Sequence, residues 1–405
     1  MPTFDQRVLA ALRSLLRASH VVSPDGLPGM ISGAGEQLGA ERTVLYLVDY
    51  EQVVLVPLQP PATADPSEAV GIDGTLAGRC FTDVTQHVTR SGGPVSTWTP
   101  VLDGSDRLGV LQVQFPAGTE VDEEVLGGCF DVASLVAELT MTRSMCGDAV
   151  ERTRRQAVMT VPAELQWTQL PPLTCISAQV GISGVLAPAA EVAGDSFDYA
   201  LNGDTAHVAL FDAMGHGMEA TLLSAVAVST LRNARRSGVG LAETVVAIER
   251  EIAQHFGGDK FVTGIVAELD VRTGWWRWVA CGHPPVMLVR GGQVVKVLDQ
   301  VICPPIGLGL LPDTVPTGEE RLQPGDRLVL YSDGVVEARN AEGEFFGVER
   351  LADLAARQAL EERPVAETLR RLNLSILDHQ EGELQDDATT VLVEWLIDEA
   401  TASTP

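Results

Sequence analysis

The amino-acid sequence predicts an α+β protein with more than one domain. Between residues 173 and 396, apolar patterns indicate strands in consecutive runs, with helices grouped between the runs. This order favours a layered α+β sandwich over a regular strand–helix–strand repeat. The chain has 405 residues, 45% of them hydrophobic, which is enough for two or three domains with buried cores.

The elements of the second half follow from hydrophobic periodicity. Alternating or continuous apolar residues predict strands, and apolar residues three or four positions apart predict helices. The expected strands are residues 173–182, 205–212, 261–269, 275–281, 285–290, 327–332 and 388–396. The expected helices are residues 217–236, 241–256, 348–358 and 365–379.

Residues 1–120 have the pattern of a separate, small α/β domain. An amphipathic helix is expected over residues 6–18, where Leu9, Leu12 and Leu16 lie on one stripe. The strands expected to follow it are residues 42–48, 52–57 and 107–115.

A connecting helix is expected within residues 121–160. The stretch from Asp122 to Gln156 contains no proline, and apolar or small residues recur in it at helical spacing. Such a helix could pair with its copy in a homodimer or pack on its own domain, and the sequence favours neither. Prolines from Pro162 onward then open a domain at residues 161–398, which a tail of residues 399–405 follows.

Composition excludes several classes of protein. A formal net charge of −27 would repel the phosphates of a nucleic acid. The apolar stretch around residues 222–228 is too short to span a bilayer, so we expect a cytoplasmic protein without a membrane partner. The six cysteines form no Cys-x-x-Cys pair, which argues against a zinc site or a disulfide framework.

Aspartates recur at the ends of the predicted strands. Asp212 ends an apolar run, Asp333 follows another, and Asp386 and Asp387 precede the last strand. Asp195 follows a glycine shortly before the strand that carries Asp212. Mg²⁺ and Mn²⁺ prefer oxygen ligands and open positions for water. The pattern therefore predicts a metal-dependent hydrolytic site.

The neighbours of these aspartates suggest further roles. Asp212 could bridge two cations with its two oxygens, and the carbonyl of Ala213 could supply another ligand. If a strand begins at Asp195, Asp198 lies on its opposite face, where we expect it to bond loop amides. Alternation also means that only one residue of the pair at 386 and 387 can face the cleft.

The motifs around these residues resemble PPM-type (protein phosphatase 2C-like) serine/threonine phosphatases. In chain order they are Ala187 to Asp198, Asp212-Ala-Met-Gly-His-Gly217, Cys281-Gly-His-Pro-Pro-Val286, Tyr331 to Asn340, Phe345-Phe-Gly347 and Asp386-Asp-Ala-Thr-Thr-Val391. They are similar to the bacterial SpoIIE-like branch for sporulation and stress response, which dephosphorylates anti-sigma-factor antagonists. The resemblance covers roughly residues 160–398. It implies an α/β/β/α sandwich of two mainly antiparallel sheets flanked by helices.

The resemblance also implies a mechanism. The catalytic acids would be Asp195, Asp212, Asp333 and Asp386, and the metal ligands would be these residues and the carbonyl of Ala213, with Asp387 as the other candidate of the last pair. Two or more Mn²⁺ or Mg²⁺ ions would hold a bridging hydroxide, so that no covalent intermediate is needed. The implied activity is hydrolysis of phosphoserine or phosphothreonine on a small regulatory protein.

A second resemblance concerns residues 1–120. Residues 71–78 and 98–111 resemble motifs of GAF domains, which bind small molecules or dimerise. This implies a regulatory or sensor domain for a small-molecule or protein effector, and allows a homodimer.

The chain departs from the phosphatase pattern at two positions. It has Ala193 where the family usually has a glycine, and Ser196 where the family has an aromatic residue. A competing interpretation is a pseudophosphatase-like binding module that sequesters a regulatory partner, although four intact acids argue against it. A hydrolase of small phosphoesters is a third interpretation, and the sequence shows no pocket motif for it.

Overall fold

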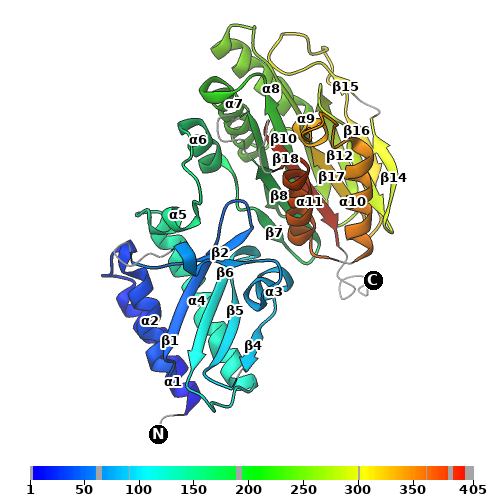
Figure 1. Cartoon of the computed structure of the whole chain (residues 1–405). Coiled ribbons are helices and arrows are strands. Elements are labelled where there is room, and N and C mark those ends of the chain that lie inside the picture. Colours follow the sequence, from blue (N-terminus) through cyan, green and yellow to red (C-terminus); the bar gives the residue numbers. More distant parts are fainter. Residues whose placement is uncertain are drawn as a thin grey trace. The chain divides into compact units, whose positions relative to one another are not determined.

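The structure is a computed structural model that describes residues 3–60, 66–90, 92–187, 194–299, 302–361, 363–381 and 386–396. The expected tail at 399–405 and the departure at Ala193 lie outside the described residues. The chain divides into two compact units, Met1–Val158 and Met159–Pro405 (Figure 1).

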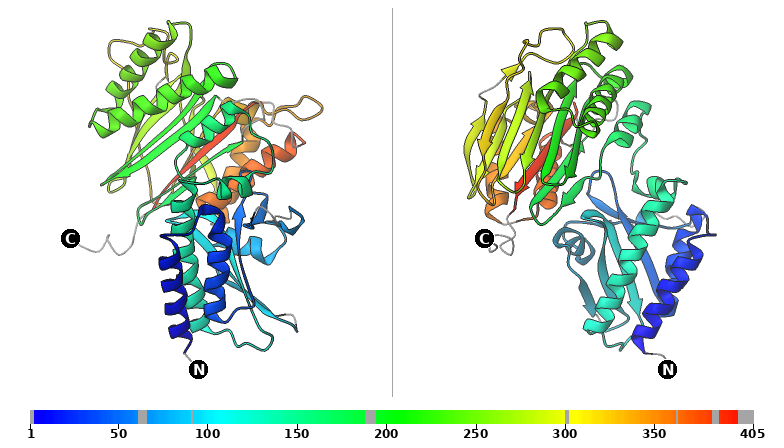
Figure 2. Two further views of the ribbon diagram at one scale, coloured as in Figure 1. Left: turned by 90° about the vertical axis from the view of Figure 1, so that its left-hand side faces the viewer. Right: turned by 180° about the vertical axis from the view of Figure 1, so that it is seen from behind.

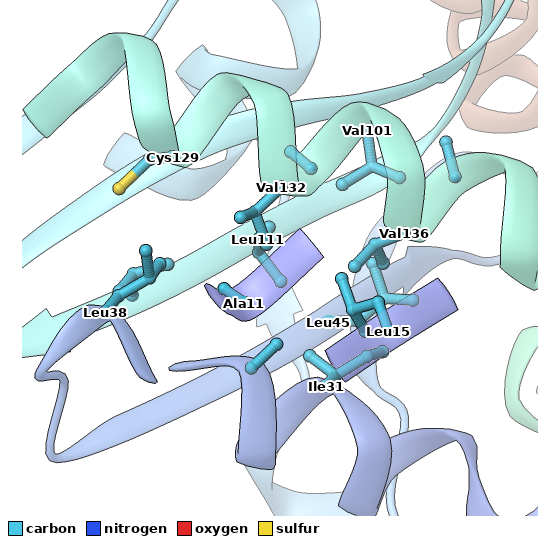
Figure 3. Close-up of a cluster of buried hydrophobic side chains, with 14 of the residues drawn as sticks. Ala11, Leu15, Ile31, Leu38, Leu45, Val101, Leu111, Cys129, Val132 and Val136 are labelled. Atoms are coloured by element: carbon cyan, nitrogen blue, oxygen red, sulfur yellow. The ribbon is translucent and has the colours of Figure 1, made fainter. Parts of the chain in front are cut away.

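The first unit is built on a six-stranded antiparallel sheet in the order β3-β2-β1-β6-β5-β4. Its strands are β1 (Arg42–Val48), β2 (Val54–Pro57), β3 (Val70–Gly71), β4 (His87–Arg90), β5 (Val95–Asp103) and β6 (Asp106–Phe115). The helices are α1 (Phe4–Ala18), α2 (Leu27–Leu38), α3 (Leu76–Asp83), α4 (Glu123–Ser144) and α5 (Ala149–Arg154). The main core packs α1, α2 and α4 on the sheet, and Figure 3 shows part of it.

Helix α1 begins with a capping box between Thr3 and Gln6. Its buried residues are Val8, Ala11 and Leu15, whereas Leu9 and Leu16, on the stripe noted in the sequence, are 47% and 50% exposed. The reason is that α1 packs against both α2 and α4, so the small Ala11 lies at the contact and part of the leucine stripe remains outside.

Helix α4, within the segment that we expected to connect the domains, is a core helix of the first unit. Its buried side chains include Cys129, Val132 and Val136, which lie over the sheet (Figure 3). By length and composition α4 is apolar enough to cross a membrane, which we did not expect from the sequence, but half of its most apolar window is buried inside the protein. A core helix of a folded domain shows the same property.

The second unit contains two six-stranded sheets. The first has the order β15-β12-β11-β10-β9, with β16 pairing β12, and the second has the order β14-β13-β17-β18-β8-β7. Every pairing is antiparallel except that of β12 with β15. The strands of the first sheet are β9 (Asp195–Asn202), β10 (Thr205–Ala213), β11 (Val262–Asp270), β12 (Trp275–Cys281), β15 (Ile302–Cys303) and β16 (Gly318–Arg321). Those of the second are β7 (Thr174–Ile176), β8 (Val180–Ala187), β13 (Val286–Arg290), β14 (Gln293–Leu298), β17 (Arg327–Tyr331) and β18 (Ala388–Trp395).

Helices cover both outer faces of this pair of sheets (Figures 1 and 2). Helices α7 (Gly217–Arg236) and α8 (Leu241–Phe256) pack on the first sheet. Helices α10 (Val348–Leu360) and α11 (Val365–His379) pack on the second. A third core, between the sheets, includes Trp276, Trp278 and Trp395. The expected α/β/β/α sandwich is therefore confirmed for this unit.

Two short helices complete the second unit and adjoin the candidate site. Helix α6 (Val161–Gln169) begins at Thr160, whose side chain accepts a hydrogen bond from the Ala163 amide. Helix α9 (Asp333–Glu337) follows β17 directly.

Candidate functional site

Two of the predicted acids face each other on neighbouring strands. Strands β9 and β10 form a hairpin in which Asp195 pairs with Asp212 at the end far from the turn. Residues directly opposite in an antiparallel pair have side chains on the same face, with Cβ atoms about 5 Å apart. The hairpin therefore places two carboxylates together at the edge of the first sheet.

This arrangement makes both carboxylates hard to ionise in the metal-free protein. Burial, followed by the charges of Asp212 and Asp387, raises the pKa of Asp195 well above its usual value. Burial and the nearby carboxylates of Asp333, Asp386 and Asp387 raise the pKa of Asp212 to about 7. A bound cation would relieve the repulsion that these shifts reflect.

The turn after β10 depends on glycine. Gly215 and Gly217 have φ angles of 92° and 72°, in the left-handed region that other residues rarely adopt. A β-carbon at Gly194 would lie 2.9 Å from the carbonyl oxygen of Ala213. Because Gly194 has no side chain, the backbone before Asp195 can lie next to the carbonyl of Ala213, which we predicted as a metal ligand.

The second sheet supplies the remaining acids. Asp333 is exposed at the first position of α9. The residue before it, Ser332, is bonded twice to Thr389 of β18. The Ser332 amide donates to the Thr389 carbonyl, and the Ser332 hydroxyl accepts from the Thr389 amide. A β-carbon at Gly334 would lie only 2.0 Å from the carbonyl oxygen of Asp387. The segment that bears Asp333 therefore lies directly against the aspartate pair that precedes β18.

The two aspartates of this pair have different environments. Asp386 is exposed, and one of its carboxylate oxygens accepts from the amide of Asp387. Asp387 is buried, and its Oδ2 accepts from the amides of Gly194 at 2.7 Å and Asp195 at 3.1 Å and from Gln166 Nε2 at 2.8 Å. Asp387 therefore joins the beginnings of β18 and β9, while Asp386 faces outward.

Asp198 corrects one expectation from the sequence. It lies on the opposite face of β9 from Asp195, as expected, but it binds two arginines of α7 instead of loop amides. Its carboxylate is buried and lies 2.7 Å from Arg232 and 2.6 Å from Arg235. The reason is that α7 covers this face of the sheet, so that long basic side chains reach the acid before a loop does.

Ser196, the other departure from the family pattern, also contacts α7. Its hydroxyl oxygen accepts a hydrogen bond of 2.6 Å from Ser224. Strand β9 is thus held to α7 by polar contacts on either side of Phe197.

The two histidines of the motifs differ in their environments. His283 is buried, its Nδ1 lies 3.0 Å from the Thr263 hydroxyl, and burial lowers its pKa to about 3. It is therefore neutral at physiological pH. His216 is exposed at the N-cap of α7. Burial raises the pKa of Asp386, and the nearby His216 acts in the opposite direction.

The fit of these residues to divalent ions can be judged from their chemistry. In the described part of the chain, no three Asp, Glu, His or Cys side chains are grouped closely enough to hold an ion by themselves. Mg²⁺, however, usually keeps several waters and binds through one or two carboxylates. Asp195 Oδ2 and Asp387 Oδ1 are buried and have no hydrogen-bond partner. The all-oxygen donor set and these unsatisfied atoms suit a hydrated Mg²⁺ or Mn²⁺ ion.

Most of the cysteines lie inside the protein. All six are free thiols; Cys80, Cys129, Cys281 and Cys303 are buried. Burial raises the pKa of the Cys129 thiol to about 11 and that of Cys80 to about 12, so both are neutral at physiological pH.

Comparison with known proteins agrees with this geometry. The family model for stage II sporulation protein E (SpoIIE) matches residues 202–396. These residues form a SpoIIE-family phosphatase domain of the PP2C type. The match includes Asp212 on β10, Asp333 on α9, and the pair Asp386 and Asp387, which directly precedes β18.

Curated relatives of the SpoIIE-family domain include one protein that is named a phosphatase. Phosphoserine phosphatase RsbU of Bacillus subtilis is 23% identical over 237 residues, which are 58% of this chain and 68% of RsbU. Protein IcfG of Synechocystis is 22% identical over 52% of this chain, and stage II sporulation protein E of Bacillus subtilis is 24% identical over 50%. The chain spans only 37% and 24% of the lengths of these last two proteins. The chain thus contains a protein phosphatase domain.

A solved structure supports the fold of the SpoIIE-family domain. The crystal structure of the RsbU and RsbW domains of a Mycobacterium tuberculosis protein is 27% identical, with a TM-score of 0.50. The match covers 57% of this chain and 64% of that one.

Two residues of the site were not found from the sequence. Gln166 contacts both the Asp195 backbone and Asp387, and it lies on α6, a helix that we did not predict from the sequence. The signal for α6 was Thr160 before Val-Pro, which is a typical helix start. Thr263 is opposite Asp212 on β11, and only the strand register reveals it.

Proposed function

We propose that this chain is a metal-dependent phosphoprotein phosphatase that hydrolyses phosphoserine or phosphothreonine. The observation that carries the proposal is the pairing of Asp195 with Asp212 at one sheet edge, next to Asp333 and Asp386 from the other sheet. A chain that needed only the fold would have no reason to bury two repelling carboxylates beside each other.

Each acid has a distinct role in this proposal. Asp195 and Asp212 would hold the ions from the buried side, and Asp333 and Asp386 would hold them from the exposed side. Asp387 fixes the backbone around Asp195. We assign the ligand role in the last pair to Asp386. When bound, two Mn²⁺ or Mg²⁺ ions supply an activated water and neutralise charge on the phosphoryl group. The buried His283 contacts the hydroxyl of Thr263, the residue opposite Asp212 on β11, and keeps Thr263 in place.

The proposed substrate is a small regulatory protein of the anti-sigma-factor antagonist type. Two facts support a protein substrate: the relative RsbU is named a phosphoserine phosphatase, and Asp333 and Asp386 are exposed. Because these two acids are exposed, a phosphorylated residue on the surface of another protein can reach them. The formal charge of −27 is compatible with this substrate because bound cations reverse the local field.

The test is phosphate release with Mn²⁺ from a phosphoserine protein and from an aryl phosphate. We expect activity in the wild type and a loss of at least about 100-fold in Asp212→Asn and Asp333→Asn. Asp204→Asn is the matched control, because Asp204 lies at the turn of the same hairpin with its side chain 62% exposed. A wild type inactive with every divalent ion would favour the pseudophosphatase interpretation, and fully active Asn variants would refute the ligand assignment.

We also propose that the first unit, with its GAF-like motifs, regulates the phosphatase domain. Removing residues 1–158, the boundary at which the units separate, tests this directly. We expect the rate of phosphate release to change. An unchanged rate together with an unchanged number of subunits in the oligomer would argue against a regulatory role.

A further inference from the structure

Gln166 connects the two halves of the candidate site through one amide group. It is 2% exposed, and its Nε2 donates to the carbonyl of Asp195 at 2.8 Å and to Asp387 Oδ2 at 2.8 Å. Asp195 begins β9 of one sheet and Asp387 precedes β18 of the other. Both donors of the amide are therefore used, one for each sheet.

The Oδ2 atom of Asp387 accepts more than the hydrogen bond from Gln166. It also accepts from the backbone amides of Gly194 and Asp195. One carboxylate oxygen thus receives three N–H donors, two from the backbone of Gly194 and Asp195 and one from α6. These bonds fix the distance between the backbone of Asp195 and the loop that carries Asp386.

We propose that Gln166 is a positioning residue for the metal site. By holding the Asp195 carbonyl and the Asp387 carboxylate at once, its amide keeps Asp195 and Asp386 at the separation that a pair of hydrated divalent ions requires. The proposal rests on the proposed function, because it assigns Gln166 a role at the same site. Gln166 itself does not touch the reacting atoms.

A purely structural role for Gln166 makes a different prediction. An amide that only anchored α6 would stabilise the unit, and its loss would lower the melting temperature without changing metal affinity. A positioning residue changes affinity, because residues that orient metal ligands typically cost about 10- to 100-fold in metal affinity or activity when they are replaced. The two roles are therefore separated by measuring Mn²⁺ binding directly.

The experiment compares Gln166→Met with the wild type in the full chain. Methionine has a similar length and volume but no donor, so it removes both hydrogen bonds with little change in packing. Gln169→Met is the matched control, since Gln169 lies on the same helix and its Nε2 donates only to Leu165 within α6. The readouts are Mn²⁺ affinity by titration calorimetry, the Mn²⁺ concentration for half-maximal hydrolysis of an aryl phosphate, and the metal-free melting temperature.

We expect Gln166→Met to weaken Mn²⁺ binding by at least about 10-fold, and excess Mn²⁺ to restore part of the rate. Gln169→Met should bind Mn²⁺ as the wild type does. Equal Mn²⁺ affinity in Gln166→Met and the wild type would overturn the positioning role and leave the proposed function intact. A wild type that binds no Mn²⁺ would overturn both.

A second variant covers the case in which Gln166→Met does not fold. Gln166→Glu keeps the shape of the side chain but places an acceptor against Asp387 Oδ2 and the Asp195 carbonyl, so we expect Mn²⁺ affinity to fall at least as much as in Gln166→Met. If both variants are unfolded without metal, Gln166 is a folding residue and the positioning role is refuted.

Discussion

The backbone of Gly334 lies directly against the carbonyl oxygen of Asp387, at a separation that leaves no room for a β-carbon. The closest approach of such an atom would be 2.0 Å, and the obstacle is backbone, which cannot rotate away. Any side chain at position 334 must therefore move the start of α9 away from the aspartate pair.

We predict that Gly334→Ala separates Asp333 from Asp386 and impairs the enzyme. Overpacking of this kind costs about 1–3 kcal/mol in the free energy of unfolding. We expect a loss of Mn²⁺-dependent phosphate release that excess Mn²⁺ does not fully restore. Gly127→Ala is the control, because Gly127 is an exposed helix position where a β-carbon meets nothing within 4 Å. Wild-type kinetics in Gly334→Ala would contradict the close approach.

The stability of the metal-free protein should fall as pH rises. Asp212 has its pKa raised to about 7, so the folded state binds a proton more tightly than the unfolded state does. The stabilisation from that proton is complete below the unfolded pKa, near 3.8, and is lost as pH rises to about 7. Melting temperatures measured from pH 5 to pH 8 in a chelator should therefore decrease.

The variant Asp212→Asn should lose less stability than the wild type as pH rises. Without the carboxylate, the metal-free protein at pH 8 should be more stable than the wild type by on the order of 2 kcal/mol, because Asp212 is only half-buried and solvent screens part of the repulsion. Added Mn²⁺ should raise the melting temperature of the wild type and not that of the variant. A variant less stable than the wild type at pH 8 would refute the repulsion.

We predict that Asp198→Asn destabilises the second unit without changing metal affinity. Asp198 is buried and paired with Arg232 and Arg235, and removal of its charge leaves two guanidinium groups without their partner. Breaking such a pair costs about 3 kcal/mol in the free energy of unfolding. Thermal and urea unfolding measure the effect. Glu361→Gln, at an exposed pair with Arg363, should unfold at the same temperature and urea concentration as the wild type, because solvent screens this pair.

We predict that Glu249 holds the loop after β15. Its buried carboxylate accepts from the backbone amides of Gly307 and Gly309. Glu249→Ala leaves both amides without this acceptor, so we expect a loss of about 2 kcal/mol and faster proteolytic cleavage near residue 307. Glu251→Ala, on the same helix, should be cleaved at the wild-type rate. Equal cleavage in both variants would show that the loop is held by other contacts.

Much of the second unit could be predicted from local patterns. The expected helices at 217–236, 241–256 and 365–379 coincide with α7, α8 and α11, because amphipathic periodicity is strong where a helix covers a sheet. The strand expected at 275–281 coincides with β12, in which Trp276 and Trp278 are buried and Trp275 is partly exposed.

Elements that depend on tertiary contacts were missed. Helix α2 contains Pro28 and three glycines, which disfavour a helix in isolation. It is helical because Gly35 lets the backbone approach Thr43, where a β-carbon would lie 1.9 Å from the hydroxyl oxygen. No pattern in the sequence of α2 itself carries this information.

The same distinction holds at the site. The aspartates could be predicted because each stands next to an apolar run that forms a strand. The contact of Gln166 with Asp387 joins residues 221 positions apart and has no local signature. It also decides which aspartate of the last pair is buried, a question that strand alternation alone left open.

The hairpin of β9 and β10 has a consequence for engineering this protein. Asp195 and Asp212 form the eighth residue pair from the turn at Gly203 and Asp204, and every pair between depends on the length of that turn. A slip by one residue would turn one carboxylate to the far face of the sheet. The turn is exposed and looks suited to an inserted tag or label, yet an insertion there that shifts the pairing would separate the two acids at the opposite end of the hairpin.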